Sequence, residues 1–474
     1  MERLSTGDKN LDAILGGGIP VFSVNVICGR PGTGKTVLTQ QLAFHNATPE
    51  RKALYLTTVS EPTIKVIRYQ QQFRFFVPEK VGESVFFQDI GGVVREGSLD
   101  KTTETIVNLV KSMRPAIVVI DSFKAIHDVS PNPTELRKFV YDLAVKMAGW
   151  QCTTFLVGEY SSDQIETEPE FAVADGVIQL TYSTTASHAR RALQVIKMRG
   201  TGYLDGQHSC VITDSGMEIF PCRLVLEDPP RVPDSHSTVS FGLPELDAIF
   251  GGGLPAYSHL LVSGAAGTGK TIFALQYAVY GALQYREPAV IFLYEESPSQ
   301  LRHLARSFGW DLETLEKEGQ LRLVFSLMSD LNLDVHLQQM RQTIQECQAR
   351  RVVIDSLAGL LHPAAEDIFL ISEKISELTC LLKKLGCTTL STTRVAGGPL
   401  ALSRYGVEES LVDGVVLLKT VATGTHRKRS LEVLKLRGAN PLMDEHRLQI
   451  TPTGLKVFYT PLYGSPDGER RTDV

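Results

Sequence analysis

Short runs of β-branched and aliphatic residues alternate along the chain with longer stretches of helical periodicity. In the first half the runs lie at 24–29, 53–58, 116–122, 153–158 and 176–180, and in the second half at 259–264, 289–294, 351–356, 388–393 and 414–418. Near-continuous apolar strands that alternate with helices are typical of parallel sheets buried on both faces. The pattern therefore predicts an α/β fold in each half, with a mostly parallel sheet and helices on both faces.

The two halves repeat the same blocks in the same order. LDAILGGGIP at 11–20 returns as LDAIFGGGLP at 246–255, IVVIDS at 117–122 as RVVIDS at 351–356, and IKMRG at 196–200 as LKLRG at 434–438. This near-constant spacing indicates a duplicated domain. We place the domains at 1–228 and 237–467, with a linker at 229–236 and a polar tail at 468–474.

Each half contains one glycine-rich loop between a predicted strand and a predicted helix. The sequences are GRPGTGKT at 29–36 and GAAGTGKT at 264–271, and both match GxxxxGK[ST]. Backbone N–H groups of such a loop and the helix N-terminus bind phosphate, while the lysine reaches the β- and γ-phosphates. The predicted ATP-binding residues are Gly32, Thr33, Gly34, Lys35, Thr36 and Val37 in the first copy and Gly267, Thr268, Gly269, Lys270, Thr271 and Ile272 in the second; Lys35 and Lys270 are also candidate catalytic residues.

An aspartate follows an apolar run in both copies. Asp121 and Asp355 are expected to hold Mg²⁺, together with the hydroxyls of Thr36 and Thr271. An aspartate at this place is often only a helix cap. Its recurrence behind a phosphate loop in both halves favours the magnesium site.

Two glutamates, Glu295 and Glu296, end another apolar run of the second copy. We expect their strand to lie beside the phosphate-loop strand, so that a carboxylate orients the water that attacks the γ-phosphate. The alternative is a solvated acidic pair at a helix start.

The first copy lacks this pair. Alignment on Pro62 and Pro298 places Val59 and Ser60 at the two positions, whereas counting from the phosphate-loop lysines places Ser60 and Glu61 there. In either register the first carboxylate is missing, and Glu61 is the one candidate that remains. We therefore expect hydrolysis mainly in the second copy.

Late strands of both copies carry a lysine and an arginine two residues apart, Lys197 and Arg199 in one and Lys435 and Arg437 in the other. Strand alternation places both cations on one face, where they require an anion. A solvated edge ladder is the alternative, and the repetition in both halves argues against it.

Composition limits the remaining choices. The chain has 474 residues, a net charge of −5 and 43% hydrophobic residues, which are values of a multidomain globular protein. The acidic balance and the absence of a basic run argue against nucleic acid as a partner. The seven cysteines follow no CxxC pattern, and no apolar stretch approaches a membrane span. We expect a cytoplasmic protein that binds neither membrane nor structural metal.

The order GGGxP, GxxxxGKT, EE, VIDS, SRYGVEESLVDGVVLL and KLRG resembles the KaiC family of RecA-like ATPases over essentially the whole chain. The resemblance is to a double-domain homologue of the family's circadian clock proteins. It implies a homohexameric double ring, ATP and Mg²⁺ at each subunit interface, and a small regulatory protein or signalling kinase as partner. Glu295 and Glu296 match the catalytic glutamates, and Ser307 and Phe308 match residues near the base. The residues that match groups reaching a neighbour's nucleotide are Arg191, Lys197, Met198, Arg199, Arg429, Lys435, Leu436 and Arg437.

The sequence departs from the clock proteins at their phosphorylation sites. Their adjacent Ser–Thr pair corresponds to Glu409–Ser410 in the second copy and to Phe171–Ala172 in the first. A two-site phosphorylation cycle is not expected, and Ser410 is the one candidate phosphosite. The tail also lacks the long extension through which the clock protein meets its activator. The main hypothesis is thus a ring ATPase; the alternatives are a serine/threonine autokinase acting near Ser410 and a RecA-like protein that handles DNA.

Overall fold

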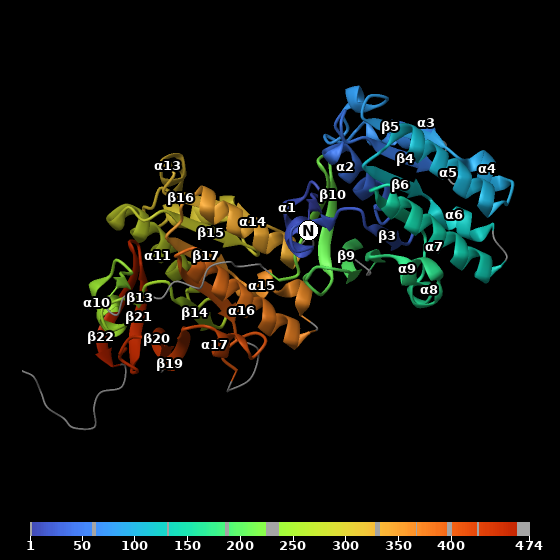
Figure 1. Cartoon of the computed structure of the whole chain (residues 1–474). Helices are drawn as coiled ribbons and strands as arrows, with labels where there is room; N and C mark the ends of the chain where they lie inside the picture. The colour runs from blue at the N-terminus through green and yellow to red at the C-terminus, as the bar shows by residue number, and fades with distance from the viewer. Residues whose placement is uncertain are drawn as a thin grey trace, which may run out of the picture. The chain divides into compact units, whose positions relative to one another are not determined.

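A computed structural model of the chain describes residues 2–58, 63–129, 132–184, 189–223, 237–327, 332–365, 367–395, 401–423 and 426–461 (Figure 1). The chain divides into two compact units, Met1–Val225 and Leu226–Val474. The predicted linker 229–236 and tail 468–474 lie outside the described residues. No helix in the described ranges is both long and apolar enough to cross a membrane.

The first unit is built on a nine-stranded sheet with the order β11-β10-β9-β8-β3-β7-β6-β4-β5. Strands β8 to β5 of that order are parallel to one another, and β9, β10 and β11 extend the sheet antiparallel. The strands are β3 (Val24–Gly29), β4 (Ala53–Thr57), β5 (Val85–Asp89), β6 (Ile117–Asp121), β7 (Thr153–Gly158), β8 (Gly176–Thr184), β9 (Ala189–Met198), β10 (His208–Thr213) and β11 (Gly216–Phe220).

The second unit repeats this topology, with the order β16-β15-β17-β18-β14-β19-β20-β21-β22. Again six neighbouring strands are parallel and three are antiparallel. The strands are β14 (His259–Gly264), β15 (Ala289–Leu293), β16 (Leu321–Phe325), β17 (Arg351–Asp355), β18 (Thr388–Arg394), β19 (Gly414–Thr423), β20 (His426–Leu436), β21 (Glu445–Thr451) and β22 (Gly454–Pro461). The predicted α/β class and mostly parallel sheets are confirmed. A two-stranded ribbon precedes each main sheet, β1 (Arg3–Leu4) with β2 (Ile19–Pro20) and β12 (Thr238–Val239) with β13 (Leu254–Pro255).

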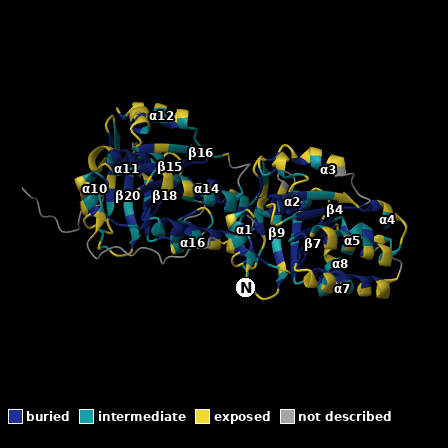
Figure 2. Ribbon diagram, turned by 45° about the horizontal axis from the view of Figure 1, so that its top comes forward, coloured by how far each residue is buried: buried dark blue, intermediate teal, exposed yellow. Residues whose placement is uncertain are grey.

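Helices cover both faces of the first sheet, as the burial pattern in Figure 2 illustrates. Tyr55 packs in one apolar cluster with α2, and its neighbours Leu54 and Leu56 pack in a second cluster with α5, α6 and α7. Adjacent residues of one strand thus enter different cores, because side chains alternate across a sheet. The helices of this unit are α1 (Lys9–Ile14), α2 (Lys35–Asn46), α3 (Thr63–Gln70), α4 (Gly91–Arg95), α5 (Leu99–Met113), α6 (Phe123–Asp128), α7 (Pro133–Gly149), α8 (Ser162–Thr167) and α9 (Pro169–Val173).

In the second unit α10 and α11 pack in one large apolar cluster with β14 and β15. Helices α14 and α16 bury further apolar residues, among them Met340 and Ile375. The helices are α10 (Pro244–Ile249), α11 (Lys270–Tyr285), α12 (Pro298–Arg306), α13 (Leu312–Lys317), α14 (Leu333–Glu346), α15 (Leu357–Leu360), α16 (Ile368–Lys384) and α17 (Glu408–Leu411).

One prediction about strand order is wrong. The strand that precedes Glu295 and Glu296, β15, lies between β16 and β17, and both β17 and β18 separate it from the phosphate-loop strand β14. The glutamates still come near the loop because all these strands are parallel and end at the same edge of the sheet. Strand neighbourhood is a long-range property that the apolar pattern of a single strand does not encode.

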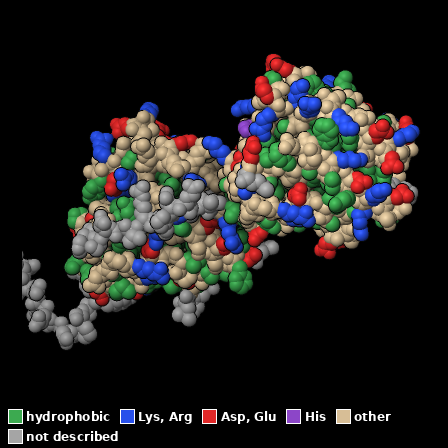
Figure 3. Space-filling view, viewed as in Figure 1, with side chains coloured by type: hydrophobic (Ala, Val, Ile, Leu, Met, Phe, Trp, Pro, Cys, Tyr) green, Lys and Arg blue, Asp and Glu red, His purple; other side chains and the backbone are tan. Residues whose placement is uncertain are grey.

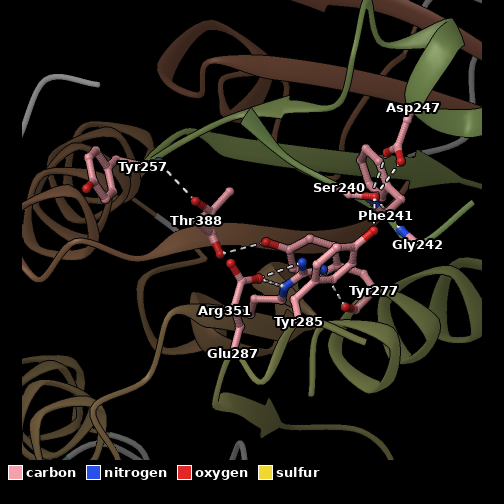
Figure 4. Close-up of polar contacts among 10 residues, drawn as sticks. All are labelled: Ser240, Phe241, Gly242, Asp247, Tyr257, Tyr277, Tyr285, Glu287, Arg351 and Thr388. Atoms are coloured by element: carbon pink, nitrogen blue, oxygen red, sulfur yellow. Dashed lines mark hydrogen bonds and ion pairs between the residues drawn. The ribbon is translucent and has the colours of Figure 1, made fainter. Parts of the chain in front are cut away.

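A buried arginine distinguishes the core of the second unit (Figure 4). Arg351 begins β17 and is 1% exposed, and its Nε and Nη2 both donate to Glu287 Oε2, at 2.7 and 2.6 Å. Its guanidinium also donates to the carbonyl of Tyr277 and lies over the rings of Tyr277 and Tyr285. The first unit has Ile117 at the start of the corresponding strand. Burying a guanidinium is tolerated here because every face of it meets a carboxylate, a carbonyl or an aromatic ring.

Candidate active site

The phosphate loops connect a buried strand to a helix in both units. Helix α2 begins at Lys35 and α11 at Lys270, and the preceding glycines, Gly34 and Gly269, have φ of 102° and 109°. Residues with a side chain rarely adopt this left-handed conformation, so glycine is required where the loop turns into the helix. The turn leaves the N-terminal N–H groups of the helix without intrahelical partners, which is the arrangement that binds phosphate.

The loop lysines bend back over their own loops. Lys35 Nζ lies 3.0 Å from the carbonyls of Gly29 and Arg30, and Lys270 Nζ lies 2.8 and 2.9 Å from those of Gly264 and Ala265. Burial lowers the pKa of both lysines. A phosphate next to each ammonium would offset this desolvation.

In the first unit the predicted magnesium ligands are in contact. Thr36 Oγ1 donates to Asp121 Oδ2 at 2.9 Å, and the Tyr55 hydroxyl donates to the same oxygen at 2.6 Å. Burial raises the pKa of Asp121, against the effects of these two hydrogen bonds and of Lys35. A buried carboxylate beside a hydroxyl is a hard-oxygen set that suits Mg²⁺, and the charge of the cation would relieve the burial.

The second unit reproduces the contact with different support. Asp355 accepts hydrogen bonds from Thr271 and Thr392, and burial raises the pKa of Asp355 as well. At the position of Tyr55 this unit has Ile291, since β4 and β15 pair with their aspartate strands in the same register. Both oxygen sets therefore fit Mg²⁺.

A cavity opens at each loop. The first, of about 600 Å³, is lined among others by Lys35, Thr36, Asp121 and Glu159. The second, of about 340 Å³, is lined by residues of the phosphate loop and of the opposite strand ends. Those lining residues are Ala266, Gly267, Gly269, Lys270, Thr271, Ile272, Glu295, Glu296, Leu304, Asp355, Ser356, Thr392, Arg394, Arg429 and Ile450. A mixed polar and apolar cleft at the carboxyl edge of a parallel sheet is where α/β proteins bind nucleotides.

The two glutamates of the second cavity have different surroundings. Glu295 accepts a hydrogen bond from Ser356 at 2.7 Å and forms an ion pair with Arg394. Glu296 makes no hydrogen bond or ion pair with any described residue. Burial, followed by the charges of Asp355 and Glu295, raises the pKa of Glu296. Glu296 is thus the carboxylate better suited to accept a proton.

Two equivalent hydrogen bonds show which residues of the two units correspond at this edge of the sheet. Thr58 N donates to the carbonyl of Asp121 at 3.1 Å, and Tyr294 N donates to that of Asp355 at 3.0 Å. Thr58 therefore corresponds to Tyr294, so the next two positions in the sequence are Val59–Ser60 and Glu295–Glu296. Residues 59–62, including the candidate Glu61, lie outside the described residues.

Sequence reasoning missed a carboxylate in the first cavity. Glu159 follows β7, and its Oε1 lies 4.0 Å from Lys35 Nζ. The corresponding residue after the duplication offset is Arg394, which is at the end of β18. The exchange of a carboxylate for a cation lies outside the blocks that the two halves share, and it becomes visible in the sequence only when residues 159 and 394 are compared directly.

Arg191 and Arg429 lie at the phosphate loops of their own units. Arg191 Nε donates to the carbonyl of Gly32 at 3.3 Å, and two nitrogens of Arg429 donate to that of Gly267 at 3.3 Å. The resemblance grouped both arginines with residues that reach a neighbouring subunit. Here both arginines contact the phosphate loop of their own unit, and their part at a neighbouring subunit stays a prediction.

The KxRG lysines lie at the other end of the same strands. Lys435 Nζ donates to the carbonyls of Glu409, Ser410 and Val412, and Lys197 Nζ donates in the same way to Phe171 and Ala172. Burial and the adjacent arginine lower the pKa of each lysine.

The arginines of these segments differ. Arg199 has the carboxylate of Asp175 at 3.4 Å. Arg437 is exposed, and its guanidinium makes no contact of this kind with the part of the chain that the structure describes. The guanidinium of Arg437 is therefore available to an anion, whereas the three N–H donors of Lys435 already point to carbonyls.

Four other predicted residues are not among the residues that line the two cavities. The side chains of Met198 and Leu436 are 5% and 8% exposed and pack in the cores. Ser307 donates to the carbonyl of Leu304, and the ring of Phe308 is tilted by 32° against that of Trp310, with centroids 5.0 Å apart. Leu304 itself lines the second cavity.

Comparison with known proteins agrees with this geometry. A family model described as the KaiC ATPase matches residues 4–223 and again 239–461. A circadian clock oscillator protein KaiC from Rippkaea orientalis is 28% identical over 93% of this chain and 85% of its own length. KaiC 1 from Synechocystis sp. is 28% identical over 93% and 86%, and KaiC from Synechococcus elongatus 27% over 92% and 85%. The chain belongs to the KaiC family of ATPases, as two tandem RecA-like domains.

Proposed function

We propose that the protein is a Mg²⁺-dependent, cytoplasmic ATPase that assembles as a homohexameric double ring and hydrolyses ATP mainly in the second unit. The observation that carries this proposal is that the pair Glu295 and Glu296 lines the second cavity together with Lys270 and Asp355. The ring would signal its nucleotide state to a protein partner, a small regulatory protein or a signalling kinase.

Each group of the second site has a distinct part in the proposed reaction. Lys270 and the loop N–H groups bind the phosphates, while Glu296 orients the attacking water and takes its proton. Glu295, fixed by Ser356 and Arg394, holds that arginine near the developing charge. Mg²⁺ bound at Thr271 and Asp355, and at Thr36 and Asp121 in the first unit, would neutralise phosphate charge.

The double variant Glu295→Gln/Glu296→Gln tests the assignment. Both side chains keep their size but lose the ability to accept a proton, so we expect turnover to fall on the order of 10²-fold or more, as for other positioned general bases. ATP binding should persist because Lys270 and the loop are unchanged. Wild-type turnover in the variant would contradict the proposal. The exposed Glu318→Gln is a matched control outside the cavity.

Assembly is proposed from the cations of the second unit. The exposed Arg437 guanidinium could bind a neighbour's phosphate directly, and the phosphate could replace one of the neutral carbonyls to which Lys435 donates. Ligand bound at such an interface stabilises the oligomer by mass action. Native mass measurements with and without ATP, on wild type, Lys35→Ala and Lys270→Ala, test this: assembly that ignores nucleotide in all three would contradict it.

Autophosphorylation near Ser410 is a second candidate function. Its hydroxyl is on an exposed residue of α17, and Lys435 binds the carbonyl of the same residue. If a neighbour's ATP binds beside Lys435, the hydroxyl of Ser410 would be close enough to accept its γ-phosphoryl group. Incubation with ATP and phosphosite mapping decides this, with Ser410→Ala as control; no phosphate on residues 401–423 excludes it.

A DNA-handling function is not favoured. On the face shown in Figure 3, Lys and Arg are interspersed with Asp and Glu over both units. Binding to a nucleic-acid backbone requires a concentrated basic surface and is weakened by salt. DNA binding that weakens as salt rises would argue for this alternative.

A further inference from the structure

The position after strand β7 of the first unit faces the phosphate loop. Strand β7 is parallel to the loop strand β3, with Gly158 opposite Cys28. The next residue, Glu159, therefore leaves the sheet at its carboxyl edge, where its Oε1 lies 4.0 Å from Lys35 Nζ. Its side chain is 56% exposed and lines the 600 Å³ cavity. Glu159 thus combines contact with the loop lysine and access to water.

The second unit has a cation at this position. In β18, Thr393 lies opposite Ser263 and is followed by Arg394, as Gly158 lies opposite Cys28 and is followed by Glu159. Arg394 forms an ion pair with Glu295. The two sites therefore differ by an exchange: the second has Glu295 with Arg394, and the first has Val59 with Glu159 at the corresponding sequence positions.

The other carboxylates of the first cavity are engaged. Asp121 accepts hydrogen bonds from Thr36 and Tyr55, and Asp128 lies 3.0 Å from Lys124. Glu159 accepts no hydrogen bond from any described residue, and its ion pair with Lys35 is long, at 4.0 Å. Among the described carboxylates that line this cavity, it is the one whose oxygens are most open to a water molecule.

We propose that Glu159 is the catalytic carboxylate of the first site. In the first unit the carboxylate that accepts a proton from the attacking water would thus follow β7, whereas in the second unit it follows β15. This inference rests on the proposed ATPase function. The carboxylate takes one proton from a water molecule while the oxygen of that water forms a bond to the γ-phosphorus. The bond from that phosphorus to the β,γ-bridging oxygen breaks, and ADP leaves with the electron pair. Glu159 lies 4.0 Å from Lys35, the lysine that would bind the γ-phosphate, so its carboxylate is close to the reacting phosphorus.

The test uses the full-length Lys270→Ala/Glu295→Gln/Glu296→Gln protein, in which the second site lacks its phosphate-binding lysine as well as both carboxylates. The remaining turnover then comes from the first site. Adding Glu159→Gln should lower the residual kcat on the order of 10²-fold, as expected when a general base is removed, and leave KM for ATP nearly unchanged. Adding Glu166→Gln, an exposed glutamate of α8, should leave both values as they are. Thermal unfolding of each protein confirms that the fold is intact.

Three outcomes overturn the inference. They are a background protein with no residual turnover, a residual kcat that Glu159→Gln leaves unchanged, and a change in KM alone. All three leave the ATPase function of the second site intact. Absence of turnover in the wild-type chain is a different result, since it would refute the proposed function itself.

Discussion

The Tyr55 hydroxyl and the Asp121 carboxylate share a 2.6 Å hydrogen bond inside the first unit. Because this bond lowers the pKa of a carboxylate that burial raises, Tyr55→Phe should bring the pKa of Asp121 still higher. We expect nucleotide binding by this unit to require more Mg²⁺, increasingly so as the pH falls. Loss of a hydrogen bond to a charged group should also cost about 1.5–3 kcal/mol of stability.

Magnesium titration and urea unfolding check this prediction. The chain has two tryptophans, and Trp150 belongs to the first unit, so a Trp310→Phe background isolates its fluorescence. Tyr69→Phe, an exposed tyrosine of α3, is the control. Equal stability of Tyr55→Phe and the control would show that the bond contributes nothing.

Two buried histidines should make the second unit sensitive to acid. Burial lowers the pKa of His259 and of His336 from 6.5 to about 4. His259 is enclosed by the hydroxyls of Thr379 and Ser391 at 2.9 and 2.6 Å. The unfolded chain, with ordinary histidines, binds protons from pH 6.5 downward while the fold does not. Stability is thus complete above pH 6.5 and falls between 6.5 and 4, by up to about 1.4 kcal/mol per pH unit for each histidine.

His259→Val gives this unit the residue that begins the corresponding strand of the first, Val24. We expect a shallower dependence of its unfolding free energy on pH between 6.5 and 4, measured through Trp310 in a Trp150→Phe background. An unchanged slope would show that His259 titrates normally in the fold.

The buried ion pair of the second unit should be costly to break. Glu287→Ala leaves Arg351, 1% exposed, with only the Tyr277 carbonyl and two aromatic rings. Uncompensated buried charges of this kind cost about 3–5 kcal/mol, and partial exposure of Glu287 favours the lower end. Glu318→Ala, which removes an exposed pair at 3.8 Å from Arg286, should cost less than about 1 kcal/mol. Similar urea midpoints for the two variants would refute the difference.

Hydrolysis by the second unit should lose rate in acid at a higher pH than an ordinary glutamate would cause. Burial and two carboxylates raise the pKa of Glu296 above 4.5, and only its deprotonated form can accept a proton from water. The acidic limb of kcat should therefore lie above pH 4.5. Asp355 and Glu295 share this site, so the limb reports the group as a whole. In Glu296→Gln the limb should disappear along with most of the activity.

Local features of this protein were readable from the sequence. The ten predicted strands, the phosphate loops and the aspartates after β6 and β17 are all present, because each depends on a short apolar run or a glycine pattern. Edge strands such as β5 and β16 were missed, since they are only partly buried and carry polar residues. Their existence depends on a partner strand more than on their own composition.

The site was harder to predict where it depends on strand order. Glu295 reaches the loop across two intervening strands, and Glu159 reaches it from an immediate neighbour. The number of strands between each glutamate and the phosphate loop cannot be read from the residues around that glutamate. Arg429 and Lys435 are likewise six residues apart but lie toward opposite ends of β20, with Arg429 at the phosphate loop and Lys435 at the carbonyls around α17.

Strand β20 carries both of these residues and therefore connects two separate sites. Arg429 contacts its own phosphate loop, and Lys435, six residues later, lies about 20 Å away at the rise of an extended chain. Strand β19 pairs with β20 over this whole segment, and β21 pairs with it from Arg429 to Glu432. In the proposed ring, this paired strand would carry one residue at the nucleotide of its own subunit and another at that of the next, so that loss of either nucleotide would change the contacts of the same strand.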